Sequence, residues 1–355
     1  MGDRLFRFVT ICGLFCCAAA CATPRVASLP AVPVQAAGET AAVATANADA
    51  ADDPAIWAAP PGRTVRIGGG AHAGFIAGTD KKAGLNIYGL DGAQLQFLPD
   101  GLLNNVDLRE GVVGGRIQVV LGASDRGRMG VALYAFDPAA TDPANAVRPY
   151  GFIKSDVIEP YGFCMGRWND ALHAVLVAKD GAVRVYQLAL GAQAAGIEIA
   201  RFKVATQPEG CAIDEAASTL YVGEELRGLW RYSLSDFTSP LLVEPAGQGR
   251  LTADVEGVTI MRDGARRYAL VSSQGDNAFA VWRIDGPAPV YAGRFSVAAS
   301  GGVDAVTGTD GLDALGGPVG PFPEGLVVVQ DDVNDGQSQN FKLVDWRVIR
   351  SALKL

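Results

Sequence analysis

The chain has 355 residues, 49% of them hydrophobic, and a formal net charge of −8. It is long enough for a large closed all-β domain, and its acidity excludes the basic footprint of a nucleic-acid-binding protein. The 44 glycines separate short apolar segments rich in Val, Ile, Leu and Tyr, a pattern that favours many short strands over helices.

The first 21 residues have the pattern of an export signal. Arg4 and Arg7 precede an apolar stretch at residues 8–20, which ends in small residues. The sequence Ala-Ala-Ala-Cys at 18–21 resembles a lipobox and predicts that Cys21 is acylated, as a lipid anchor of the mature protein. We therefore expect an exported bacterial protein, in the periplasm or at the outer membrane. Because the usual Leu at the third position before the cysteine is missing, plain cleavage to a soluble exported protein is the alternative.

The next segment differs in composition from the rest of the chain. Residues 22–48 are rich in Ala, Pro, Val and Thr and show little periodicity. This composition predicts a flexible tether. We expect the folded domain at residues 49–355.

Six copies of one pattern follow in that domain, each an apolar strand, a short charged loop and a second strand built around an aromatic residue. The loops lie at residues 80–82, 124–126, 179–180, 224–225, 274–276 and 330–332. Their spacing, roughly 45 to 65 residues, is typical of propeller blades. The sequence therefore predicts an all-β, six-bladed β-propeller, in which equivalent loops meet at one end of a central channel.

Motifs for covalent catalysis are missing from the sequence. His72 lies in a Gly-rich segment and His173 in an apolar strand, and the sequence has no G-x-S-x-G, P-loop, CxxC or HExxH motif. This composition leaves metal-assisted hydrolysis as the chemistry that the charged loops allow.

Carboxylates and cations recur in the predicted loops. In an extended strand Asp254 and Glu256 would point to the same face. Oxygen ligands without Cys or His favour Ca²⁺ or Mg²⁺ over zinc. The cations in these loops either pair with the carboxylates or bind a polyanion; they are Lys81, Lys82, Arg126 and Lys179. Together these loops predict an anion held between protein cations and bound metal.

Only two of the six cysteines lie in the predicted domain, Cys164 and Cys211. In an exported protein such a pair predicts one disulfide. Two separate buried thiols are the alternative.

Ten motifs resemble those of β-propeller (alkaline) phytases, in the same order along residues 49–346. They are DAADDPAIW (49–57), DKKAGLNIYGLDG (80–92), LNNVDLR (103–109), YGFCMG (161–166), PEGCAIDE (208–215), LYVGEELRGLWRY (220–232), DVEGVTI (254–260), SSQGDNAFAVW (272–282), TDGLDAL (309–315) and NFKLVDW (340–346). The resemblance implies a six-bladed propeller that binds several Ca²⁺ ions. It implies hydrolysis of phosphate monoesters of myo-inositol hexakisphosphate (phytate) and other inositol phosphates, by direct attack of a metal-activated water. We expect a monomer with no nucleic-acid or protein partner.

The resemblance also implies roles for individual residues. It assigns metal binding to Asp52, Asp53 with the backbone at Val106, Glu209, Glu225, Asp254, Glu256, Gln274, Asp304 and Asp310. It assigns the phosphate being cleaved to Lys81, Arg126 and Tyr161, which with Glu209 and Glu225 form the predicted catalytic group. It assigns a neighbouring phosphate to Lys82, Lys179 and Asp180, where Asp180 replaces a common Glu.

The resemblance is incomplete near the C-terminus. Gly308 stands where an Asp is common inside the 304–310 loop, which weakens one ion site. The segment between Asp331 and Asn340 is short for the structural calcium site that the resemblance implies there. Glu39 is the candidate for an acidic residue expected upstream of Asp49.

Two other functions stay open at this point. One is a different calcium-dependent propeller hydrolase, such as a lactonase, which would not need four cations opposite the carboxylates. The other is a non-catalytic propeller that binds a protein partner through an apolar patch.

Overall fold

The structure, a computed structural model, describes residues 26–46 and 49–355. The predicted signal peptide and Cys21 lie outside the described residues. None of the helices in the described part is long and apolar enough to cross a membrane.

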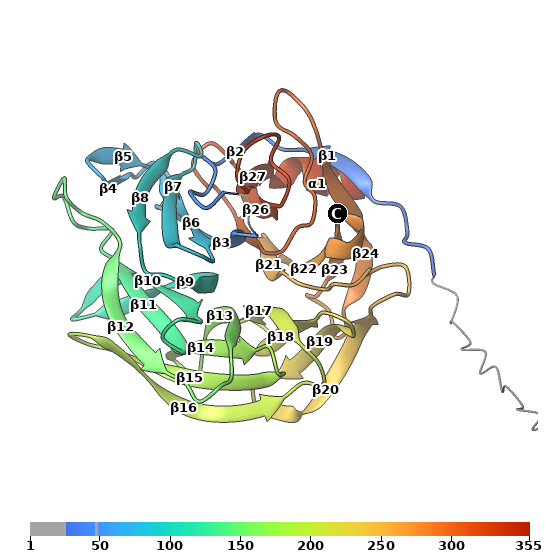
Figure 1. The fold of residues 1–355 in the computed structure, drawn as a ribbon, viewed down its shortest axis with the longest axis horizontal. Helices are drawn as coiled ribbons and strands as arrows, with labels where there is room; N and C mark the ends of the chain where they lie inside the picture. Colours follow the sequence, from blue (N-terminus) through green and yellow to red (C-terminus); the bar gives the residue numbers. More distant parts are fainter. Residues whose placement is uncertain (1–25, 47–48) are drawn as a thin grey trace, which may run out of the picture.

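Four-stranded antiparallel meanders are the building unit (Figure 1). The first contains β3 (Ala51–Ala58), β6 (Gly74–Asp80), β7 (Gly84–Gly89) and β8 (Gln94–Leu98). A hairpin of β4 (Val65–Ile67) and β5 (Gly70–His72) interrupts it. The next contains β9 (Leu103–Val113), β10 (Arg116–Asp125), β11 (Gly130–Phe136) and β12 (Arg148–Lys154). It is followed by β13 (Pro160–Trp168), β14 (Ala171–Ala178), β15 (Ala182–Leu190) and β16 (Ala194–Lys203).

The second half of the chain continues in the same way. One sheet contains β17 (Pro208–Asp214), β18 (Thr219–Glu224), β19 (Gly228–Ser233) and β20 (Asp236–Pro245). Another contains β21 (Val258–Asp263), β22 (Arg266–Ser273), β23 (Ala278–Arg283) and β24 (Val290–Ala298), with the 3₁₀ turn Gln274–Asp276 between β22 and β23. The last contains β25 (Leu312–Gly316), β26 (Gly325–Asp331) and β27 (Asn340–Asp345), and a helix, α1 (Trp346–Leu353), follows β27.

The first strand of each meander lies at the centre of the molecule. Contacts run from β3 to β9, β13, β17, β21 and β25 in turn, and from β25 back to β3. This closed ring confirms the all-β propeller predicted from the sequence. Its count of six blades stays a prediction, because a parallel bridge from Gly151 to Ala194 joins two of the meanders into one eight-stranded sheet.

The core lies between neighbouring sheets, so a strand such as β3 is buried on both faces. Successive side chains of a strand point to opposite faces. Ile56 packs in the cluster that contains Tyr88 and Phe341, whereas Trp57 packs in the cluster that contains Phe75 and Phe136. Each sheet is thus sandwiched between two others, and the strands are apolar without strict alternation.

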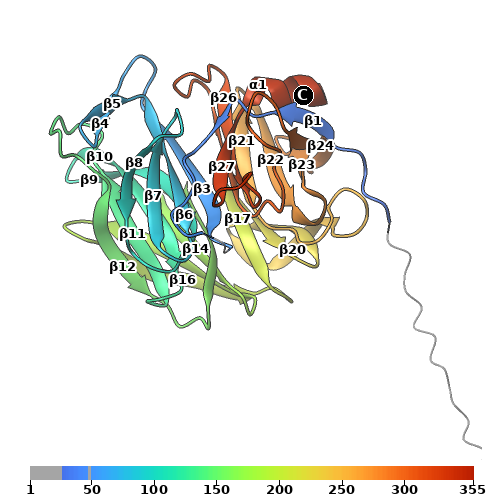
Figure 2. The same cartoon turned by 45° about the horizontal axis from the view of Figure 1, so that its top comes forward.

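The N-terminal segment belongs to the folded domain. Strand β1 (Val32–Gln35) runs parallel to β24, and β2 (Gly38–Glu39) pairs antiparallel with β27. Val34 is buried in the core with Phe295, and α1 lies beside β1 and β24 (Figure 2). The prediction of a flexible tether at residues 22–48 is therefore wrong for residues 26–46. Strands this short show no alternating pattern in the sequence, because their stability comes from pairing with the sheets they join.

Candidate active site

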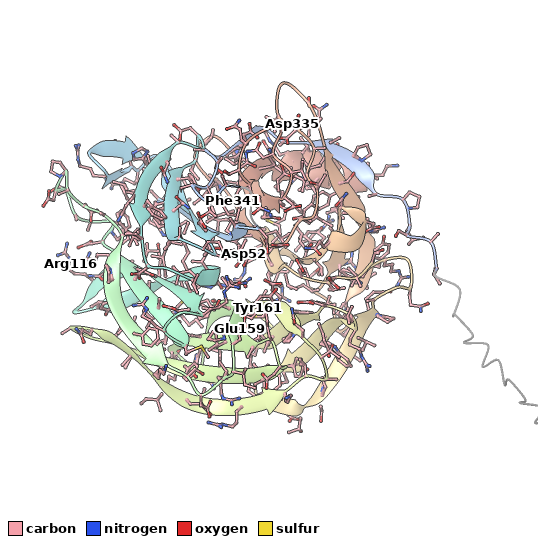
Figure 3. All side chains as sticks on the ribbon, viewed as in Figure 1. Asp52, Arg116, Glu159, Tyr161, Asp335 and Phe341 are labelled. Carbon is pink, nitrogen blue, oxygen red and sulfur yellow. A yellow bond between two sulfur atoms is a disulfide. The ribbon has the colours of Figure 1, made fainter. Side chains whose placement is uncertain are left out.

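Segments from different sheets bring carboxylates to one end of the ring. Asp52 lies in β3, Glu209 in β17, and Asp310 just before β25. Figure 3 shows Asp52 and Tyr161 near the centre of the molecule. Backbone hydrogen bonds join these segments, since Gly311 N–H donates to the carbonyl of Asp52 at 3.0 Å. A Cβ at Gly311 would lie 2.2 Å from Asp53 Oδ1, so only glycine permits this approach.

Lys81 is the buried cation of this end. Its Nζ lies 2.9 Å from Asp52 Oδ1, 2.8 Å from Asp310 Oδ2 and 2.6 Å from Asp49 Oδ1. Burial by itself would lower the pKa of Lys81, but the carboxylates of Asp52, Asp310 and Glu209 outweigh it and raise that pKa. The ammonium therefore stays charged, as a phosphate-binding group must.

Within the described residues, three glutamates form a close group of carboxylates that could hold a metal ion. Glu209, Glu225 and Glu256 each offer an oxygen, and these oxygens all lie within 4.8 Å of one another. Burial raises the pKa of Glu209 and of Glu256, and nearby carboxylates raise both further. Carboxylates this close favour a bound cation, because a cation removes their mutual repulsion. Their oxygens suit Ca²⁺ or Mg²⁺.

Gln274 and Asp310 extend this group. Gln274 Nε2 donates to Glu256 Oε2 at 2.9 Å and to Asp310 Oδ1 at 2.6 Å. Burial raises the pKa of Asp310 to about 7; Lys81 acts in the opposite direction and Asp52 adds to the rise. The structure thus gathers five of the predicted metal-binding carboxylates with Gln274 around Lys81: Asp52, Glu209, Glu225, Glu256 and Asp310.

Asp254 lies near this group, although in a different conformation from the one expected. Residues 254–257 form no strand, so the prediction that Asp254 and Glu256 share a strand face is wrong. The segment instead bonds to neighbouring loops: Val255 N–H donates to the carbonyl of Glu225, and Gln274 N–H donates to that of Asp254. These bonds to other sheets replace the ladder that a strand would need.

Arg126 and Tyr161 border the carboxylates. Arg126 Nη2 donates to the carbonyl of Lys81 at 2.7 Å, and its buried Nε has no hydrogen-bond partner among the described residues. Burial raises the pKa of Tyr161, and Glu209 and Asp52 raise it further, so its hydroxyl stays protonated. Both side chains can donate hydrogen bonds to an anion here.

The three residues predicted to bind a neighbouring phosphate differ in their surroundings. Lys82 is exposed next to Lys81. Lys179 Nζ lies 3.2 Å from Glu159 Oε1 and 4.6 Å from the centre of the Tyr161 ring. Asp180 instead accepts from Ala182 N–H at 3.1 Å and lies 3.3 Å from Lys203 Nζ, so its contacts hold the turn that carries Lys179.

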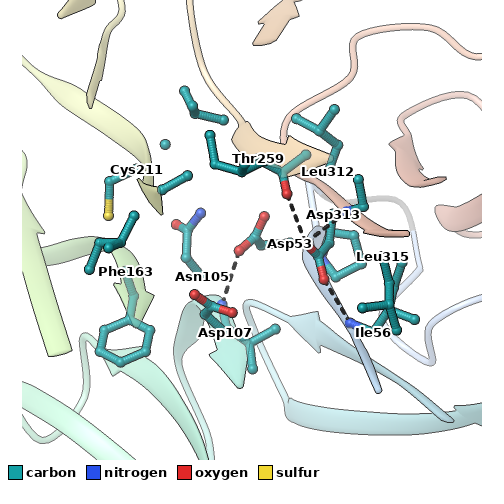
Figure 4. A pocket seen from close by; sticks show the side chains of 18 of the residues that line it. Asp53, Ile56, Asn105, Asp107, Phe163, Cys211, Thr259, Leu312, Asp313 and Leu315 are labelled. Atoms are coloured by element: carbon teal, nitrogen blue, oxygen red, sulfur yellow. Dashed lines mark hydrogen bonds between the residues drawn. The ribbon is translucent and has the colours of Figure 1, made fainter. Parts of the chain in front are cut away.

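Asp53 points away from the carboxylate group and into the channel. A cavity of about 280 Å³ lies there, lined by Asp53, Asp107 and Asp313 among others (Figure 4). Asp53 Oδ2 accepts from Val106 N–H at 3.2 Å, which brings together the two residues predicted to share a metal. Burial raises the pKa of Asp53 and the neighbouring Asp52 adds to it.

Sequence reasoning missed Asn104 and Asp49. Asn104 Nδ2 donates to Asp52 Oδ2 at 2.7 Å and to Glu209 Oε1 at 3.0 Å, and its buried Oδ1 has no partner among the described residues. Asp49 contacts Lys81. Both residues lie in motifs quoted above. Asn104 is uncharged and Asp49 is one of several Asp residues in its segment, so nothing in the sequence marked either as a site residue.

The cysteines and Asp304 complete the set of predicted residues. Cys164 in β13 and Cys211 in β17 form a disulfide, which joins the strands that carry Tyr161 and Glu209. Asp304 lies apart from the group around Lys81 and contacts Lys342 instead.

Fold and site together define a propeller hydrolase for an anionic substrate. A family model described as Phytase matches residues 6–354. The chain is 33% identical over 332 residues to the 3-phytase of Bacillus subtilis (strain 168), which covers 89% of this chain and 84% of that protein. The chain therefore belongs to the β-propeller (alkaline) phytase family and is a phosphoric monoester hydrolase. This membership confirms the resemblance and favours it over the lactonase-like and non-catalytic alternatives.

Proposed function

We propose that the protein releases phosphate from phytate in a calcium-dependent reaction, as a 3-phytase-type enzyme. The observation that carries this proposal is the group formed by Glu209, Glu225 and Glu256, whose ligand oxygens lie within 4.8 Å. With Asp52 and Asp310 these glutamates make five predicted metal-binding carboxylates at this end of the ring, and Lys81 contacts Asp52 and Asp310 directly. Such a group needs further positive charge to stay ionised. The family membership supports phytate as the substrate.

The residues present fit calcium at this group. The donor set consists of carboxylate and amide oxygens, and the orphaned Oδ1 of Asn104 adds one more buried oxygen. When bound, calcium supplies Lewis-acid charge and lowers the pKa of the water that attacks phosphorus.

The chain's own residues bind and orient the phosphate. Lys81 and Arg126 offset charge on the oxygens of the phosphoryl group, and Tyr161 donates a hydrogen bond to it. The carbonyl of Lys81 fixes the guanidinium of Arg126, so the two cations are held as a pair. Lys82 and Lys179 bind a neighbouring phosphate of the substrate, and Asp180 stabilises the turn that carries Lys179 through Lys203. Because water is the nucleophile, no phosphoenzyme forms.

Phosphate release from phytate tests this function. Purified protein should release phosphate with calcium present, lose that activity in excess chelator, and regain it when calcium is returned. A melting curve recorded alongside separates loss of calcium from loss of fold. Full activity in excess chelator would contradict the calcium requirement. Turnover of a lactone without turnover of phytate would favour the lactonase-like alternative.

A further inference from the structure

A second buried lysine lies where β2 pairs with the last sheet of the ring. Lys342 lies in β27, and its side chain is fully buried. Its Nζ lies 2.5 Å from Glu39 Oε2 and 3.1 Å from Asp331 Oδ2, and it also contacts Asp304 Oδ1. Glu39 comes from β2, Asp331 from the end of β26, and Asp304 from the loop before β25. One ammonium therefore links β2 to the last sheet of the ring.

Donors other than Lys342 also bond to these carboxylates, at the second oxygen of Asp304 and of Asp331 and at the same oxygen of Glu39 that contacts Lys342. Asn340 Nδ2 donates to Glu39 Oε2 at 3.0 Å, and Asp335 N–H donates to Asp304 Oδ2 at 3.0 Å. Thr307 N–H donates to Asp331 Oδ1 at 2.9 Å. The ion pair of Asp331 Oδ2 with Lys342 lacks the angle of a hydrogen bond, so it is electrostatic. In this cluster one ammonium contacts all three carboxylates, whereas within the described residues no ion pair joins a lysine to Glu209, Glu225 or Glu256.

The family resemblance assigns Asp304 to a metal, and the residues present do not fit one. A calcium ion binds carboxylate oxygens at about 2.3–2.6 Å. An ion on the oxygens of Asp304 and Glu39 that contact Lys342 would therefore lie within a few ångströms of its ammonium. Two cations at that distance in a buried site repel strongly.

We propose that the ammonium of Lys342 is the cation of this cluster, so that Asp304 binds no calcium ion and the ring is closed without metal. This closure holds β2 against β27 whether or not the active site contains calcium. The three carboxylates and Lys342 then form one charge network that stabilises the junction of the two chain ends.

Asp304→Asn tests the inference, because Glu39 and Asp331 still hold Lys342 in that variant. Calcium bound per molecule, measured by elemental analysis of the equilibrated protein, should be the same as in the wild type. The melting temperature should fall by a similar amount in calcium and in chelator. Loss of one bound ion, or a fall seen in calcium and not in chelator, would overturn the inference. If the protein does not stay folded in chelator, the calcium count decides alone.

Glu225→Gln serves as the matched control, since it also neutralises one carboxylate. Its calcium count should fall if the proposed function is right. An unchanged count in Glu225→Gln would count against the proposed function and leave the Asp304 result valid. Lys342→Met supplies an independent check: removal of the cation should lower the melting temperature in chelator as well as in calcium, and no loss in chelator would overturn the inference.

Discussion

The ammonium of Lys179 lies over the ring of Tyr161, with Nζ 4.6 Å from the ring centre. The face of an aromatic ring attracts a cation, and the carboxylate of Glu159 at 3.2 Å holds the ammonium from another side. Tyr161 is assigned to the phosphate being cleaved and Lys179 to its neighbour. One contact thus fixes the spacing between the two proposed phosphate sites.

Lys179→Ala should lower kcat/KM for phytate more than kcat/KM for a simple monophosphate ester. The monophosphate has no second phosphate, so it cannot lose a contact with Lys179. We expect kcat/KM for phytate to fall by about tenfold more than for the monophosphate, which corresponds to about 1.4 kcal/mol. Lys154→Ala, which removes an exposed lysine that bonds to the Arg128 carbonyl, is the charge-matched control. Equal losses on both substrates would refute the division into two phosphate sites.

Glu225→Gln should keep the fold and lose more than about tenfold in kcat, roughly 1.4 kcal/mol of transition-state stabilisation. The side chain of Glu225 is half-buried and accepts a hydrogen bond from Gln207. A glutamine at position 225 has nearly the same shape and can accept the same bond. The adjacent Glu224 is the contrast, because it accepts from Thr206 and from Trp230 Nε1 and so has a structural role. Glu224→Gln should therefore lower the melting temperature with a smaller effect on kcat. A loss of kcat in Glu225→Gln below tenfold would contradict its central role.

The stability of the protein should depend on pH through Asp313. Burial raises the pKa of Asp313 from 3.8 to about 6, and Asp107 adds to the rise. Between these values the folded protein holds a proton that the unfolded chain has lost, so this contribution to the free energy of unfolding falls as pH rises through about 6. Asp313→Asn does not titrate. The free energy of unfolding of Asp313→Asn minus that of the wild type should therefore be larger near about pH 7 than near about pH 4.

Denaturant unfolding at several pH values in fixed calcium measures this difference. The exposed Asp91→Asn is the matched control, since it replaces one surface Asp with Asn in the same way. A constant difference between Asp313→Asn and the wild type across the range would show that Asp313 keeps its ordinary pKa.

Reduction of the disulfide should destabilise the protein by about 2–4 kcal/mol. The bond joins cysteines 47 residues apart, so it restricts a long loop of the unfolded chain. The free energy of unfolding with and without reductant measures the effect, and mass spectrometry of unreduced peptides checks the pairing. The double variant Cys164→Ser/Cys211→Ser should be insensitive to reductant. Two alkylatable thiols in the wild-type protein, produced in an oxidising compartment, would end this prediction.

The propeller and much of the site could be predicted from the sequence, because each depends on a pattern that repeats. Apolar strands at blade spacing predicted the ring, and the ring brings the loops after equivalent strands to one end. Lys81 and Glu209, which lie 128 positions apart in the numbering, both belong to that end. The order of the motifs predicted the family, which the comparisons confirmed.

Tertiary structure decided the features that depend on contacts between unlike segments. Asp52 and Asp53 are adjacent in sequence, yet one joins the carboxylates around Lys81 and the other faces the channel. Strands β1 and β2 form only because β24 and β27 offer them partners. Lys342 looks like one polar position in an apolar strand, and its role depends on carboxylates at positions 39, 304 and 331. Local pattern determines which strands form, whereas the folded ring determines which charges meet, because charges interact through space and not along the chain.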